Sequence, residues 1–260
     1  MAELLAEGYR RLFKGKRFYI VMSVMAGIAV LLTLLYAAAN KFISSEIALE
    51  ADDTGVLASM KYYADNLLFS NDGLMVLLVG ITAGMLIVQD FRNNTIRNKI
   101  IIGHSRTKIY LANFIVSVSV MLIYEAVYLL VAFVLGGIML GFKEVPSQEF
   151  FVNLLHLLLI ELAMTSLIVF LCTSMKNIGG FVLSISMHYV VSMFALALLA
   201  LNKYPKAQEI VVEAVPSYQM NLINTSTMPE HGPRMALFML VITLVSTIGG
   251  ILIFNKSDLK

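Results

Sequence analysis

Residues 110–140 read YLANFIVSVSVMLIYEAVYLLVAFVLGGIML, and Glu125 is the only charged side chain among them. A helix needs about 20 mostly apolar residues to cross the roughly 30 Å hydrocarbon core of a bilayer. This stretch exceeds that length, whereas an average helix of a globular protein has only about 10–14 residues. Residues 110–140 therefore predict a membrane-spanning helix.

Five other stretches have the same character, which gives six predicted spans. The chain has 260 residues, of which 59% are apolar and 14% charged, whereas soluble domains have about 45–50% apolar and 25% charged residues. This composition excludes a disordered chain, and the single cysteine, Cys172, excludes a disulfide scaffold. We expect an all-α polytopic membrane protein in which residues 1–260 form one transmembrane domain. The predicted spans are 18–39, 70–89, 110–140, 151–173, 178–201 and 234–254.

Basic residues are concentrated on one side of the predicted spans. If both termini face the cytoplasm, 13 of the 19 Lys and Arg residues lie on the inner side and six on the outer side. Loops on the cytoplasmic side of membrane proteins carry an excess of Lys and Arg, so we expect this orientation. The net charge of +2 is too balanced to indicate nucleic-acid binding, and no nucleic-acid partner is expected.

The N-terminal segment 1–17 predicts an amphipathic helix that precedes the first span. Its apolar residues recur at near-helical spacing, and they are Leu4, Leu5, Tyr9, Leu12 and Phe13. The remaining surface is basic, with Arg10, Arg11, Lys14 and Lys16. We expect this helix to lie flat in the inner membrane interface, with its basic side chains among anionic lipid head groups. Gly8 lowers the helix propensity in the middle of the segment.

The polar segment 90–106 connects the second and third predicted spans and reads DFRNNTIRNKIIIGHSR. It mixes basic with apolar side chains, namely Arg92, Arg97 and Lys99 with Ile96, Ile100 and Ile101. This mixture predicts a short amphipathic helix along the membrane face. We expect the helix to end at Gly103, because glycine adopts the left-handed conformation of a helix terminus without steric penalty. The segment is typical of one that is gripped by a cytoplasmic partner.

On these residues the sequence resembles the permease subunits of the second exporter class of ABC transporters, which have six spans and no nucleotide-binding domain. Many members follow the second span with an acidic residue, a Gly-Thr-like pair, a basic residue and a Pro-x-Ser-Arg turn. The matching positions here, in the same order, are Asp90, Asn94-Thr95, Arg97 and Gly103-His104-Ser105-Arg106. The departures are Asn94 for glycine, Gly103 for proline, and Asn113 for a lysine early in the third span.

The resemblance implies that 90–106 is a coupling segment that docks in a cleft of a separate ABC ATPase subunit. The residues to which it gives this role are Asp90, Arg97, Gly103, His104, Ser105 and Arg106. It also implies two ATPase copies and a second copy of this permease or a related permease, surrounded by membrane lipid. The implied function is export of a hydrophobic or amphipathic peptide, lipid or drug across a bacterial cell membrane.

ATP hydrolysis is expected on the partner subunit, because a phosphate-binding loop needs the sequence Gly-x-x-x-x-Gly-Lys-Ser/Thr. Gly15-Lys16 is followed by Arg17 and does not fit this pattern. We therefore expect no enzyme activity and no cofactor on this chain, with ATP and Mg²⁺ bound by the ATPase.

Four ionisable side chains lie inside the predicted spans, namely Glu125, His156, Glu161 and His188. Such residues are energetically costly in a membrane, and they mark either a translocation pathway or a polar pair between helices. His156 and Glu161 are five residues apart and do not share a helix face. Both interpretations stay open from the sequence, although we name all four as candidates for the translocation pathway.

Three other functional classes fit the sequence less well. An intramembrane metalloprotease needs paired ligands such as His-Glu-x-x-His, which the sequence lacks, and Ser184 with His188 is the nearest approach to a serine-type pair. A secondary transporter is favoured by inverted repeats or by spans broken at proline, and no predicted span has an internal proline. A structural or receptor-type membrane subunit is the third alternative.

Overall fold

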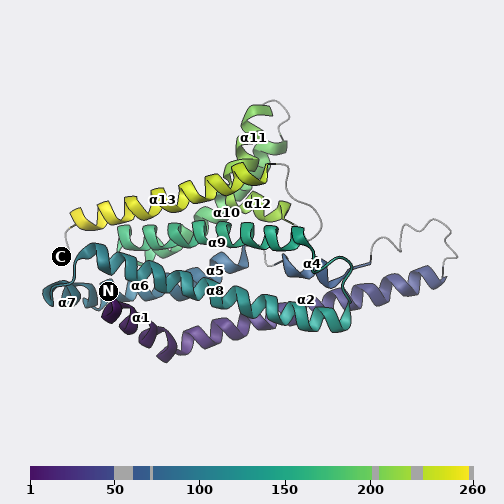
Figure 1. The fold of residues 1–260 in the computed structure, drawn as a ribbon, viewed down its shortest axis with the longest axis horizontal. Helices are drawn as coiled ribbons and strands as arrows, with labels where there is room; N and C mark the ends of the chain where they lie inside the picture. The colour runs from purple at the N-terminus through teal and green to yellow at the C-terminus, as the bar shows by residue number, and fades with distance from the viewer. Residues whose placement is uncertain (50–60, 71–72, 201–204, 224–230, 258–260) are drawn as a thin grey trace.

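The computed structural model describes residues 1–49, 61–70, 73–200, 205–223 and 231–257. These residues form helices, and no strand occurs among them (Figure 1). The elements are α1 (Ala2–Lys14), α2 (Lys16–Leu49), α4 (Ala64–Leu68), α5 (Leu74–Val79), the π-helix η1 (Gly80–Gly84), α6 (Met85–Arg92), α7 (Thr95–Ile101), α8 (Arg106–Met139), α9 (Gln148–Met175), α10 (Ile178–Ala200), α11 (Pro205–Ala214), α12 (Pro216–Leu222) and α13 (Gly232–Lys256).

The predicted all-α polytopic architecture is confirmed, because six helical stretches of the described residues are long and apolar enough to cross a membrane. They are Lys16–Ser45, Leu74–Arg92, Arg106–Met139, Gln148–Met175, Ile178–Ala200 and Gly232–Lys256. Several of these helices extend into polar sequence beyond the predicted bounds. The third begins at Arg106 rather than at residue 110, because the Ser105 side chain caps it by accepting a hydrogen bond from the backbone N–H of Lys108.

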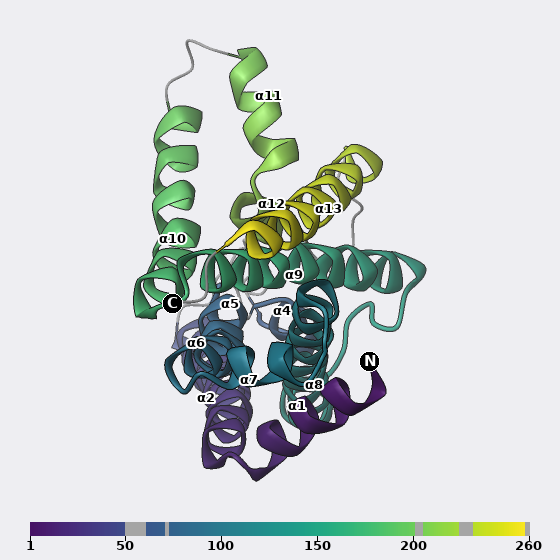
Figure 2. The same cartoon turned by 90° about the vertical axis from the view of Figure 1, so that its left-hand side faces the viewer.

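Helix α9 lies in the middle of the molecule, between two groups of helices (Figure 2). One group contains α1, α2 and α4 to α8, and the other contains α10 to α13. Helix α9 packs against α8 in the first group and against α10 and α13 in the second. Side chains of α9 therefore reach both groups.

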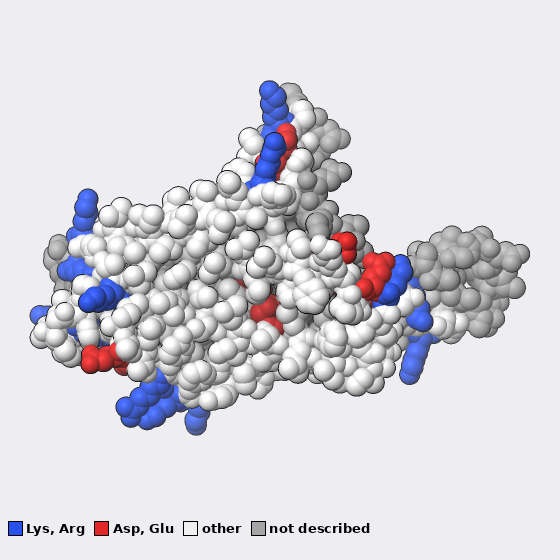
Figure 3. Space-filling view, viewed as in Figure 1, with Lys and Arg blue, Asp and Glu red and all other residues white. Residues whose placement is uncertain are grey.

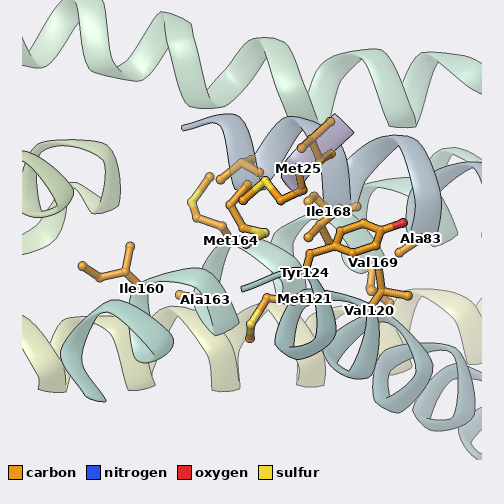
Figure 4. Close-up of a cluster of buried hydrophobic side chains, with 14 of the residues drawn as sticks. Met25, Ala83, Val120, Met121, Tyr124, Ile160, Ala163, Met164, Ile168 and Val169 are labelled. Carbon is orange, nitrogen blue, oxygen red and sulfur yellow. The ribbon is translucent and has the colours of Figure 1, made fainter. Parts of the chain in front are cut away.

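The buried core is formed where α2, η1, α8 and α9 meet (Figure 4). Met25 of α2, Ala83 of η1 and Tyr124 of α8 lie there beside Ile168 of α9. The Tyr124 hydroxyl is hydrogen-bonded to the Thr82 hydroxyl (2.8 Å), and it donates to the carbonyl oxygen of Phe18 (3.2 Å). These bonds connect the π-helix to α8 and to the start of α2. Short π-helical turns inside α-helices are often found at functional sites.

One end of the bundle carries α1, α7, the start of α8 and the end of α13, together with most of the basic side chains (Figures 1 and 3). We call it the basic end. Its described basic residues are Arg10, Arg11, Lys14, Lys16, Arg17, Arg92, Arg97, Lys99, Arg106, Lys108, Lys176 and Lys256. The predicted segments 1–17 and 90–106 therefore lie at the same end of the molecule.

Candidate functional site

Helix α7 joins α6 to α8 at the basic end and has two chemically different faces. Ile96 and Lys99 are three residues apart, share one face, and are buried against the bundle. Arg97 and Ile101 are four residues apart on the opposite, exposed face, and Ile102 follows at the helix end. Ile101 is 73% exposed and Ile102 is 77% exposed. The helix thus presents one basic and two apolar side chains outward, and we call this the α7 face.

Both ends of α7 depend on left-handed backbone conformations. Asn94 precedes the helix with φ of 55°, a conformation that asparagine tolerates better than most residues. Gly103 follows with φ of 103°, the Gly103 N–H donates to the Ile100 carbonyl, and the His104 N–H donates to the Lys99 carbonyl. This is the Schellman arrangement of a helix end, and the predicted end at Gly103 is confirmed. A proline at position 103 could not adopt this φ, so the turn differs from a Pro-x-Ser-Arg turn.

The buried face of α7 is held by a network of ion pairs. The Asp90 carboxylate is only 3% exposed, and it pairs with the Arg11 guanidinium and with Lys99 Nζ, the latter at 3.4 Å. Lys99 Nζ also lies 3.3 Å from Glu7 Oε1, and Arg11 lies 3.9 Å from the same carboxylate oxygen. A buried carboxylate needs such partners to offset its loss of hydration. The network joins α1, the end of α6 and α7 into one unit.

The predicted partner contacts therefore separate into exposed and internal residues. Asp90 is buried in the ion-pair network, and Ser105 caps α8 while remaining exposed. Arg106 Nη1 donates to the carbonyl oxygens of Phe254 and Asn255, both at 3.0 Å, and to that of Ser257. These carbonyls belong to the end of α13, where the helix dipole favours a cation.

The other three predicted contacts lie closer to the surface. His104 Nε2 lies 4.0 Å from the Glu3 carboxylate of α1. Gly103 is exposed at the turn, and Arg97 is exposed on α7. Of the six predicted contact residues, Arg97 therefore has the charged side chain that is most available to a partner.

Sequence reasoning missed the roles of Glu7, Arg11 and Lys99, because their pairing with Asp90 joins segments far apart in the chain. The i, i+4 spacing of Glu7 and Arg11 was the one local signal. The sequence predicted a short amphipathic helix along the membrane face but did not assign its isoleucines to one side or the other. In the structure Ile96 is buried against the bundle, and Ile101 and Ile102 are exposed.

The four ionisable residues of the spans lie at three separate places. Glu125 of α8 and Glu161 of α9 are each 1% exposed, and their carboxyl groups lie close enough to each other to interact electrostatically. His156 Nε2 lies 3.1 Å from Gln219 Oε1 of α12.

His188 of α10 lines an apolar cavity of about 250 Å³ between α9, α10, α12 and α13. Met164, Met187 and Ile242 contribute to its wall. The His188 ring also packs edge to face on Tyr189, with ring centroids 5.1 Å apart. The structure thus brings Glu125 and Glu161 together, and it places each histidine at a different helix interface.

Comparison with known proteins gives one family match. The sequence model of a family described as ABC-2 family transporter protein matches residues 12–195. The matched region runs from the end of α1 into α10 and contains α7, so it covers more than half of the chain. No curated protein gives a significant match.

Proposed function

The chain belongs to the ABC-2 family of transporter proteins, and we propose that it is the transmembrane subunit of an ATP-driven ABC exporter. The family supports a multi-pass membrane subunit that works with an ABC ATPase subunit. In our proposal the ATPase binds ATP and Mg²⁺ and docks at the basic end, which faces the cytoplasm of a bacterial cell. A second copy of this permease, or a related one, completes the pathway. The exported substrate is a hydrophobic or amphipathic peptide, lipid or drug.

The observation that carries this proposal is the α7 face. Ile101 and Ile102 are exposed side by side in a polar connecting segment. They form an apolar surface that is in contact with water unless a partner covers it. Exposed apolar groups rimmed by polar residues mark protein interaction sites. Arg97 adds a positive charge that can pair with an acidic group of the partner. The α7 face therefore suits insertion into a cleft of the ATPase.

The contacts behind α7 support a mechanical role. The ion pairs of Asp90 join α7 to α1 and α6, and Arg106 joins the start of α8 to the end of α13. A displacement of α7 by closure of two ATPase subunits would therefore act on four helices at once. In our proposal this displacement reshapes the interface between two permease subunits by alternating access or lateral entry of the substrate.

Truncation of the α7 face tests the proposal. The variant Ile101→Ala/Ile102→Ala is produced together with the cognate ATPase, and the ATPase that copurifies with the tagged permease is measured. Truncating two central anchors of an interface weakens binding by about tenfold or more. The matched control is Ile138→Ala/Ile248→Ala, which truncates two isoleucines exposed on α8 and α13. Equal recovery of the ATPase with both variants would exclude docking at the α7 face.

A further inference from the structure

A cavity of about 460 Å³ lies at the elbow between α1 and α2, where the N-terminal helix turns into the first span. Arg10, Lys14 and Arg17 line it, and all three are exposed. Figure 3 shows a group of basic side chains at this elbow. The volume is within the range of small-ligand sites, which is about 300–1,000 Å³. The cavity is therefore large enough for a compact anionic group.

The positive charge of this cavity is not neutralised within the described part of the chain. Arg11 also lines the cavity, but it pairs with Asp90 and Glu7. Within the described residues, no ion pair involves Arg10, Lys14 or Arg17. Cations that surround one cavity repel each other, and a bound anion relieves this repulsion. Arg and Lys are also the side chains that most often bind phosphate.

The wall of the cavity continues into an exposed apolar surface. Phe18 lines the cavity, and its ring contacts the rings of Phe13 and Tyr19, with centroid distances of 5.3 Å in both cases. Phe13 and Tyr19 are exposed, as is Ile20 in the next position of α2. A ligand that fills this site should therefore carry an anionic group beside an apolar chain.

We propose that this cavity binds the phosphate of an anionic phospholipid headgroup from the inner leaflet. Arg10, Lys14 and Arg17 contact the phosphate, and an acyl chain lies along Phe13 and Ile20. Basic residues next to an amphipathic helix and a span are suited to anionic lipids of the cytoplasmic leaflet. The bound lipid braces the elbow and so fixes α1, which contacts α7 through the ion pair of Glu7 with Lys99. This inference uses the orientation proposed above and does not depend on the ATPase.

Lipid binding to the purified permease tests the proposal. Phosphatidylglycerol retained by the chain is titrated by native mass spectrometry, with zwitterionic phosphatidylcholine as the comparison lipid. The test variant is Arg10→Gln/Lys14→Gln/Arg17→Gln. Its matched control is Arg92→Gln/Lys108→Gln/Lys256→Gln, which removes the same charge from exposed positions of the basic end outside the cavity. We expect phosphatidylglycerol to bind the test variant at least about tenfold more weakly and the control as it binds the unmodified chain.

Other outcomes would overturn the proposal. If both triple variants lose phosphatidylglycerol binding equally, the lipid is held by the overall positive charge of the basic end rather than by the cavity. If phosphatidylglycerol and phosphatidylcholine bind equally well, the cavity does not select an anion. Displacement of phosphatidylglycerol by excess inorganic phosphate or glycerol 3-phosphate would assign the site to a soluble phosphate. If the test variant still binds phosphatidylglycerol but no longer copurifies with the ATPase, the surface is a contact with the ATPase. If the test variant is not monodisperse, Arg17→Glu is compared with Lys256→Glu in the same titration.

Discussion

At the scale of single residues, Asp90 shows how a sequence motif and a structure differ in what they assign. The motif placed Asp90 among the contacts to a partner, whereas the structure buries it between Arg11 and Lys99. In the structure it belongs to the ion-pair network that positions α7. The order of motif residues along a chain does not reveal which of them are buried, and the Arg11 partner lies on another helix.

We predict that Asp90→Asn lowers the free energy of unfolding by about 2 kcal/mol, because it leaves two cations beside a neutral amide. Partial exposure of Arg11 keeps the loss below that of a fully buried pair. Thermal unfolding of Asp90→Asn, Arg11→Gln and the double variant measures the coupling between the two side chains. Glu144→Gln is the control, since its pair with Lys143 is exposed. Additive effects of the two single changes would contradict the ion pair.

Glu125 gives a second prediction at this scale, because its contact with Glu161 favours polar pairing between α8 and α9 over a place in the pathway. Glu125→Gln preserves a hydrogen-bonding side chain and should leave the melting temperature and transport nearly unchanged. Glu125→Ala leaves the buried Glu161 carboxyl without this polar neighbour and should cost about 1–3 kcal/mol of stability. An unchanged melting temperature with lost transport in Glu125→Gln would assign the pair to the substrate pathway.

At the scale of helices, the contact between α1 and α8 explains the glycine in the middle of α1. A Cβ atom at Gly8 would lie 2.8 Å from Val116 Cγ2, so the missing side chain lets the two helices approach closely. The Tyr9 hydroxyl is hydrogen-bonded to the Ser119 hydroxyl (2.7 Å) beside this contact. From the sequence, Gly8 is only a residue of low helix propensity. The close packing that requires a glycine there involves Val116, which is more than 100 residues away in the chain.

Gly8→Ala should therefore loosen α1 from α8 and lower stability by about 1–3 kcal/mol, the usual cost of overpacking. Addition of Val116→Ala should restore most of this loss, because it removes the clashing methyl groups. Gly27→Ala is the control, since nothing lies within 4 Å of a Cβ atom at Gly27 in α2. It should be neutral or slightly stabilising. Equal melting temperatures of Gly8→Ala and Gly27→Ala would contradict the close packing of α1 against α8.

Arg106 also belongs at this scale, because it connects two helix ends. Reversing the charge of Arg97 or Arg106 would uncouple transport without affecting the fold only if the side chain has no internal contacts. The three carbonyl contacts of Arg106 at the end of α13 mean that Arg106 does not meet this condition, and its loss would also free the last turn of α13. Arg97 is exposed and remains a suitable position for such a change.

At the scale of the whole molecule, hydropathy was sufficient to predict the six spans, because each contains an apolar stretch long enough to cross a bilayer. It could not give their ends, since capping side chains such as Ser105 and Ser147 extend helices into polar sequence. It also could not bring α1, α7 and α13 together, because ion pairs and hydrogen bonds between distant segments do so. The candidate site was therefore located by sequence, while its exposed face was defined only by the structure.

The proposed binding of α7 to the ATPase concerns the whole molecule, because the ATPase and the substrate pathway are on different parts of the assembly. Helix α8 has 34 residues and is about 50 Å long, so Ile138 lies far from the basic end. Ile138 is 78% exposed, which matches the exposure of Ile102. The two positions therefore form a matched pair of exposed isoleucines, one at the α7 face and one near the opposite end of α8.

Site-specific photo-crosslinking from these two positions tests the central claim most directly. A photoreactive amino acid replaces Ile102 or Ile138 in permease produced with its ATPase in membrane vesicles, and crosslinked products are identified by mass spectrometry. The account predicts a crosslink to an ABC ATPase from position 102, with a yield that changes when ATP is added, and none from position 138. A crosslink from position 138 without one from position 102 would contradict docking at the α7 face.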